Sequence, residues 1–135
     1  MADITKSSDA GLTRGEFNHS QSRQAGAEIV AGDALRLDSN GLLQKASTAT
    51  QFASGTFGTQ YAFAGLAPRA IPSGTVGEVY GAGTEWFYAD SGLTIPGAVY
   101  LSATAGKLAN SPVNANDNPV GQVLTATNIK LDKGV

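Results

Sequence analysis

This sequence of 135 residues has no cysteine and a single histidine, and only 15% of its residues are charged. Without cysteine the chain cannot form a disulfide or a thiolate metal site, although this absence does not fix its compartment. Nine basic and eleven acidic side chains give a net charge of −2, so direct binding to nucleic acid is not expected. Low charge and 17 glycines favour short strands and turns, and no window carries a convincing helical repeat.

Long apolar runs are also missing. The first six residues lead into polar sequence without an apolar stretch, so we expect no secretory signal. Residues 46–68 carry no charge, but the serines, threonines and glutamines among them break the apolar character that a bilayer core requires. The sequence therefore predicts a soluble protein with no membrane partner.

The sequence contains no recognisable set of catalytic groups. His19 lies in a polar N-terminal stretch, and no serine has the glycines of a nucleophile elbow around it. Residues 38–41 begin like a calcium loop, but Leu42 and Ala49 stand where further oxygen ligands belong, so we expect a turn. We predict no catalytic, cofactor or metal site, and hence a protein that is not an enzyme.

Two glutamates leave one enzymatic alternative open. Glu78 and Glu85 flank Gly81 and Gly83, which lack the later glycine and the helix of a dinucleotide loop and so predict a hairpin bend. Across such a hairpin the two carboxylates would face each other, as in an accessory domain of a glycoside hydrolase. Opposed like charges on a strand pair more often lie in solvent without binding anything.

The clearest pattern in the sequence is a repeat. Residues 32–43 and residues 97–108 each hold an apolar run between two glycines nine positions apart, with a leucine two positions beyond the second glycine. A hairpin explains both stretches, because the apolar run can form a strand and Gly41 or Gly106 can supply the positive φ of a tight reversal. The sequence therefore predicts two equivalent hairpins.

The repeat extends downstream, because residues 63–67 follow the first hairpin much as residues 119–123 follow the second. We expect two related modules, at about 28–71 and 93–131, joined by a third hairpin at 75–89. Short strands with frequent turn signals predict an all-β fold, a compact small barrel or sandwich.

Residues 1–26 differ from the rest, since polar side chains dominate and no period of two or 3.6 persists. One interpretation is a disordered terminus. The other is an extended N-terminal arm that orders against a partner through isolated apolar residues. We expect the arm, with Leu12 and Phe17 as its contacts, ahead of a single β domain at 27–135.

Three consecutive aromatic residues are candidates for binding. On a strand, Trp86 and Tyr88 face one way and Phe87 the other. Both faces can be covered within the monomer, or the aromatic side chains can contact another subunit or a capsid, where large rings contribute much of the binding energy. A platform for stacking sugars is the third possibility. We take Trp86 and Tyr88 as candidates for a subunit interface.

Residues 95–108 and 118–131 resemble the C-terminal part of the small capsid decoration, or cement, proteins of tailed bacteriophages. Residues 32–41 and 63–67 are similar to the first half of these proteins. The resemblance rests on the spacing of apolar residues and glycines, and residues 1–27 lie outside it.

The resemblance implies a structural virion protein that is made in the host cytoplasm and placed on the outer capsid surface. Such proteins are commonly homotrimers at three-fold and quasi-three-fold positions, where they contact the major capsid protein and stabilise the shell against packed DNA. No catalytic or ligand residues carry over from the family. The alternative function is a carbohydrate-binding β module on a phage or cell surface, with Trp86 and Tyr88 as its stacking faces.

Overall fold

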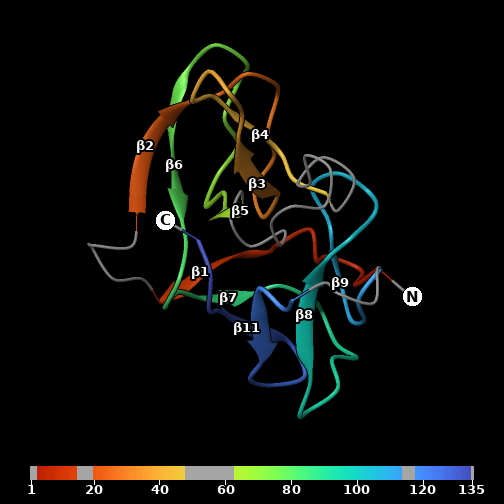
Figure 1. Ribbon diagram of the computed structural model, residues 1–135. Helices are drawn as coiled ribbons and strands as arrows, with labels where there is room; N and C mark the ends of the chain where they lie inside the picture. Colours follow the sequence, from red (N-terminus) through yellow and green to blue (C-terminus); the bar gives the residue numbers. More distant parts are fainter. Residues whose placement is uncertain (1–2, 15–19, 48–62, 114–117, 135) are drawn as a thin grey trace.

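The protein is built from two antiparallel sheets (Figure 1). The computed structural model describes residues 3–14, 20–47, 63–113 and 118–134, and no helix occurs within these ranges. The prediction of an all-β fold is therefore confirmed. The strands are β1 (Gly11–Arg14), β2 (Ser20–Gln24), β3 (Ala34–Leu37), β4 (Leu43–Lys45), β5 (Phe63–Leu66), β6 (Val76–Tyr80), β7 (Glu85–Phe87), β8 (Ala98–Leu101), β9 (Leu108–Ala109), β10 (Gly121–Val123) and β11 (Asn128–Leu131).

The two sheets share one connectivity. The five-stranded sheet has the order β2-β6-β5-β3-β4, and the six-stranded sheet has the order β1-β7-β11-β10-β8-β9. When β1 is set aside, each sheet places its first strand at one edge, then its fifth, fourth, second and third. We call β2–β6 the first unit and β7–β11 the second unit. The predicted hairpins are β3–β4 and β8–β9, so both are confirmed.

The two units also share their register. Leu35 pairs with Gly65 in the first unit, and Val99 pairs with Gly121 in the second. A Cβ atom on Gly65 would collide with the carbonyl oxygen of Tyr80, and one on Gly121 would collide with that of Lys130. Both glycines therefore let a neighbouring strand approach at the same point of the sheet.

Each sheet curls until its edges meet at one end. In the first unit the Gly26 backbone donates a hydrogen bond to Leu43 O at 2.9 Å. In the second unit the Ile4 backbone donates to Leu108 O at the same distance. Leu43 and Leu108 begin the equivalent strands β4 and β9. The first unit is thus closed by the continuation of β2, whereas the second is closed by residues near the N-terminus.

The predicted third hairpin does not form. β6 pairs with β2 and β5 in one sheet, whereas β7 pairs with β1 and β11 in the other. Between them Gly81–Thr84 crosses from sheet to sheet, with Gly83 N donating to Leu131 O at 2.8 Å. Turn-forming glycines mark a change of direction in the sequence, but they do not say which strand comes next in the sheet, and the prediction failed on this point.

The described part of residues 1–26 belongs to the domain and is not a separate arm. β1 pairs with β7, β2 pairs with β6, and Ile4 is buried in the core. The polar composition that suggested an arm has another cause, because Gln21, Ser22 and Gln24 of β2 are solvent exposed. A strand at the edge of a sheet needs no alternation of apolar residues when both of its faces meet water.

The apolar core has two clusters. The larger one contains Trp86, Tyr88 and strand residues of the second unit, and it extends to Ala34, Phe63 and Leu66 of the first unit. The smaller one, around Ile29, Leu35 and Ile71, lies within the first unit. The larger cluster therefore joins the two units into one domain.

Candidate functional site

The second unit contacts the first through the turn of its hairpin. This second turn (residues 102–107) places Gly106 against the first unit, where Ala34 N donates to Gly106 O at 2.9 Å and Gly106 N donates to Ala46 O at 2.8 Å. Gly106 is buried and has a φ of +86°, so the turn needs a residue without a side chain at this point. We call this contact the docked turn.

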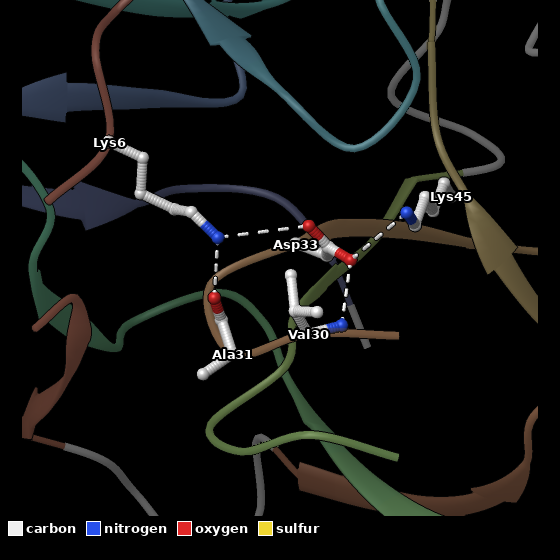
Figure 2. A network of polar contacts seen from close by, with 5 residues as sticks. All are labelled: Lys6, Val30, Ala31, Asp33 and Lys45. Carbon is white, nitrogen blue, oxygen red and sulfur yellow. Dashed lines mark hydrogen bonds and ion pairs between the residues drawn. The ribbon is translucent and has the colours of Figure 1, made fainter. Parts of the chain in front are cut away.

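Charged side chains surround the docked turn (Figure 2). Asp33, whose side chain is only 8% exposed, accepts a hydrogen bond from Val30 N at 2.9 Å. The ammonium groups of Lys6 and Lys45 approach its two carboxylate oxygens at 3.8 Å each. Figure 2 shows the two lysines on either side of the carboxylate. The network links the N-terminal segment, the start of β3 and the end of β4.

Lys6 has a second partner in this network. Its ammonium group donates to Ala31 O at 2.6 Å. Burial lowers the pKa of Lys6, although the carboxylate of Asp33 opposes this shift. An added Cβ on Gly106 would lie 3.2 Å from a carboxylate oxygen of Asp33, so the network packs directly against the docked turn. Its evident role is to hold the N-terminal segment and the two units together.

The structure corrects the assignment of Trp86 and Tyr88 to a subunit interface. Their exposed fractions are 0% and 1%, and the indole nitrogen of Trp86 donates to Thr84 Oγ1 at 2.9 Å. Burial raises the pKa of the Tyr88 phenol. Neither ring is available to another subunit or to a sugar, because the face of the strand that carries them packs into the larger core.

The predicted arm contacts lie in different situations. Leu12 is half-buried in β1, where it pairs in register with Trp86 and packs against the larger core. Phe17 lies outside the described residues, as does His19. A capsid contact by Leu12 or Phe17 stays a prediction.

Glu78 and Glu85 do not form the facing pair that a hydrolase would need. They lie on strands of different sheets, because the hairpin that would oppose them is absent. Glu78 accepts a hydrogen bond from the Tyr80 hydroxyl at 3.1 Å, and Glu85 accepts one from the Asn128 amide at 2.8 Å. The hydrolase hypothesis therefore loses its structural basis.

The glycine of the corresponding turn in the first unit, Gly41, has no such neighbour among the described residues. In this first turn (residues 38–42), Asp38 accepts hydrogen bonds from Asn40 N at 2.8 Å and Leu42 N at 3.0 Å. These bonds and one from the Gln44 amide lower the pKa of Asp38. No described atom lies within 4 Å of an added Cβ on Gly41. The predicted turn is confirmed.

A pocket of about 230 Å³ opens beside the start of β8. We call it the β8 pocket, and its lining includes Ile4, Leu93, Gly97, Ala98, Asn110 and Val123. Ile95, which is 57% exposed, lies between two further lining residues, Thr94 and Pro96. No local pattern in the sequence indicates this pocket, because its lining comes from four separate stretches of chain that only the tertiary fold brings together.

Among the described residues, no group of three or more histidine, cysteine or acidic side chains is placed to hold a metal ion. No helix that could cross a membrane is found in the same residues. Comparison of the sequence with protein-family models and with curated proteins finds no match.

Proposed function

We propose that this protein is a structural decoration protein that binds the outer surface of a tailed-phage head. The observation that carries the proposal is the duplication: two units of one connectivity and register are locked together by the docked turn and a shared core. A firm body with two equivalent halves suits a surface that presents the same contacts many times. The sequence resemblance to cement proteins supports the same proposal.

Binding of this kind stabilises a shell by mass action. A ligand that binds only the assembled state favours it by about 2.7 kcal/mol per site when its concentration is a hundred times Kd. A homotrimer at three-fold and quasi-three-fold positions would engage three copies of the major capsid protein at once, so each single contact can be weak. Stabilisation of the expanded shell against internal DNA pressure then needs no chemical step.

Phe17, which lies between β1 and β2 in the sequence, is the proposed attachment to the capsid. Both of these strands are edge strands of their sheets. A large apolar side chain can contribute much of the binding energy at such a contact. Leu12 packs on the core, so its contribution to attachment would be to hold β1 in place.

Cosedimentation with expanded, DNA-free heads of the phage that carries the gene tests this proposal. We expect saturable binding, density at three-fold and quasi-three-fold positions in a reconstruction, and heads that resist heating better when decorated. Phe17→Ala should lower occupancy, whereas Val76→Ala, at a residue that is 69% exposed on β6, should not. Absence of the protein from pelleted heads would reject the function, and unchanged occupancy of Phe17→Ala would reject only the attachment through Phe17.

A further inference from the structure

We propose that copies of this chain associate head to tail, with the first turn of one copy entering the β8 pocket of the next. This contact follows from the internal duplication and does not depend on the proposed function. Within one chain, the second turn already docks on the first unit. The first turn and the β8 pocket are the equivalent pair of surfaces, and no described residue fills the pocket or lies against Gly41.

The two turns begin in the same way, although the second is one residue longer. In each, a backbone N–H donates to a side-chain oxygen two residues earlier: Asn40 to Asp38 at 2.8 Å, and Thr104 to Ser102 at 2.9 Å. A backbone bond closes each turn, from Asp38 N to Leu42 O at 2.9 Å and, one residue further along, from Ser102 N to Lys107 O at 3.2 Å. The first turn is therefore a shorter version of the turn that docks.

The glycines of the two turns differ only in their surroundings. Gly41 and Gly106 have φ values of +78° and +86°. Gly106 is buried against Asp33 and Lys45, whereas Gly41 has no described neighbour near its added Cβ. The glycine with this backbone conformation is therefore buried by neighbouring residues in the second turn, whereas no described residue lies against it in the first turn.

The β8 pocket is the counterpart of the surface on which the second turn docks. Ala67 N donates to Asp33 O at 3.1 Å in the first unit, and Val123 N donates to Gly97 O at 2.9 Å in the second. This register makes Gly97 the equivalent of Asp33 and, one residue on, Ala98 the equivalent of Ala34. Gly97 and Ala98 both line the β8 pocket.

The remaining equivalence is between Lys45 and Asn110. Each follows its hairpin leucine, Leu43 or Leu108, by two residues. Asn110 also lines the β8 pocket. Three lining residues of the pocket, Gly97, Ala98 and Asn110, therefore correspond to residues that lie against the docked turn in the first unit.

The chemistry of the β8 pocket fits the first turn. Where the first unit has the charged Asp33 and Lys45, the pocket has Gly97 and Asn110, so it offers space and a neutral amide. The tip of the first turn carries the neutral side chains of Ser39 and Asn40. The carboxylate of Asp38, at the base of the turn, accepts hydrogen bonds from Asn40 N and Leu42 N. The tip can therefore enter a neutral pocket while the charge of Asp38 stays outside it, so that no unpaired charge is buried.

The two surfaces lie on different units, which makes the contact heterologous. In Figure 1 the hairpin β3–β4 lies in the upper half of the molecule and β8 in the lower half. A contact between different patches produces a ring when its rotation closes and an open chain when it does not. Every copy then uses its own turn and its own pocket, and in a ring each copy is held on two sides.

Disulfide trapping tests the contact directly, because the chain has no native cysteine. Asn40→Cys and Asn110→Cys are prepared as separate full-length proteins, and both positions are exposed. On mild oxidation an equimolar mixture should give the crosslinked heterodimer at well above twice the yield of either homodimer, which is the ratio that random pairing gives, and the double variant should give closed or laddered multimers. A random 1:2:1 distribution of the three dimers, or Asn40–Asn40 dimers alone, would overturn the head-to-tail contact.

Sedimentation equilibrium of the unmodified chain gives the second readout. We expect self-association that Asn40→Trp weakens at least about tenfold, a change of about 1.4 kcal/mol. Ser73→Trp, on another exposed turn, is the matched control and should leave self-association unchanged. A monomer at every concentration, or equal effects of the two tryptophans, would contradict the proposal. No heads are present in either experiment, so head binding by a monomer and self-association without head binding are separate outcomes.

Discussion

β2 and β7 occupy the same position in their units, yet one is solvated and the other is buried. Ser20 pairs with Tyr80 in the first unit as Glu85 pairs with Lys130 in the second, so Gln21 is the equivalent of Trp86. Gln21 is exposed, whereas Trp86 has no exposed surface. The backbone arrangement tolerates either side chain, because hydrogen bonds between neighbouring strands do not depend on what the side chains contact.

β2 and β7 differ in burial because, among the described strands, β7 has a neighbour on its outer edge and β2 has none. β1 pairs with the outer edge of β7, and its Leu12 lies next to Trp86 in register. No described strand pairs with the outer edge of β2. The N-terminal residues therefore complete the second unit twice, as an edge strand and as the closing segment at Leu108. In the first unit β2 fulfils the closing role through its own continuation.

Alanine substitution of the two equivalent residues should show the largest difference between the units. Trp86→Ala removes a fully buried indole from the core that joins the units, and we expect a loss of about 3–5 kcal/mol in the free energy of unfolding. Gln21→Ala, at the same place in the first unit, should change it by less than about 0.5 kcal/mol. Urea unfolding of both variants gives the two values. Similar losses would mean that β2 carries packing that its exposure does not show.

The sequence carried enough information for the hairpins but not for the N-terminal strands. Gly41 and Gly106 mark the reversals because local backbone conformation requires them, so β3–β4 and β8–β9 were predictable. β2 is hydrophilic throughout, and only its pairing with β6 makes it a strand. Pairing between distant segments leaves no local signal in such a sequence. The crossing at Gly81–Thr84 was missed for the same reason.

The candidate site was also only partly predictable. The aromatic residues were recognised as important, but alternation places Trp86 and Tyr88 on one face without saying what covers that face. That face packs into the larger core, which includes Ala34, Phe63 and Leu66 from the other unit. No pattern in the sequence indicates the role of Asp33, because only the fold brings its partners Lys6 and Lys45 close to it.

The equivalent glycines Gly65 and Gly121 lie at a point where the two units have the same structure. Gly65→Ala and Gly121→Ala each place a methyl group against a backbone carbonyl that cannot move aside easily. We expect each to destabilise the protein by about 1–3 kcal/mol. Gly65→Ala should have the larger effect, because Gly65 also has a φ of +138°. Thermal or urea unfolding measures both.

A third glycine variant is the control for this pair. Gly74→Ala has a positive φ but no described atom within 4 Å of the added Cβ, so it reports backbone strain without a collision. We expect it to cost less than Gly65→Ala. If Gly121→Ala were neutral, the close approach of β11 to β10 would not be a requirement of the second unit, and the equivalence of the two glycines would fail.

The smallest expected effect is the pH dependence of stability that Tyr88 produces. When the register of β2 and β7 is continued by one residue, its counterpart in the first unit is the half-buried Arg23. Because burial raises the pKa of Tyr88 above its ordinary value of 10.0, the unfolded chain releases the phenol proton first as pH rises. Stability should therefore fall above pH 10, by on the order of 1 kcal/mol at pH 11. Tyr88→Phe removes this loss. Lys6 acts in the opposite direction, since its lowered pKa makes the native state lose a proton before the unfolded chain does. Urea unfolding of the wild type and of Tyr88→Phe at pH 8 and pH 11 separates the effect of the Tyr88 phenol from that of the Lys6 ammonium group. If both proteins lost the same stability between pH 8 and pH 11, the buried phenol would not control this part of the pH profile.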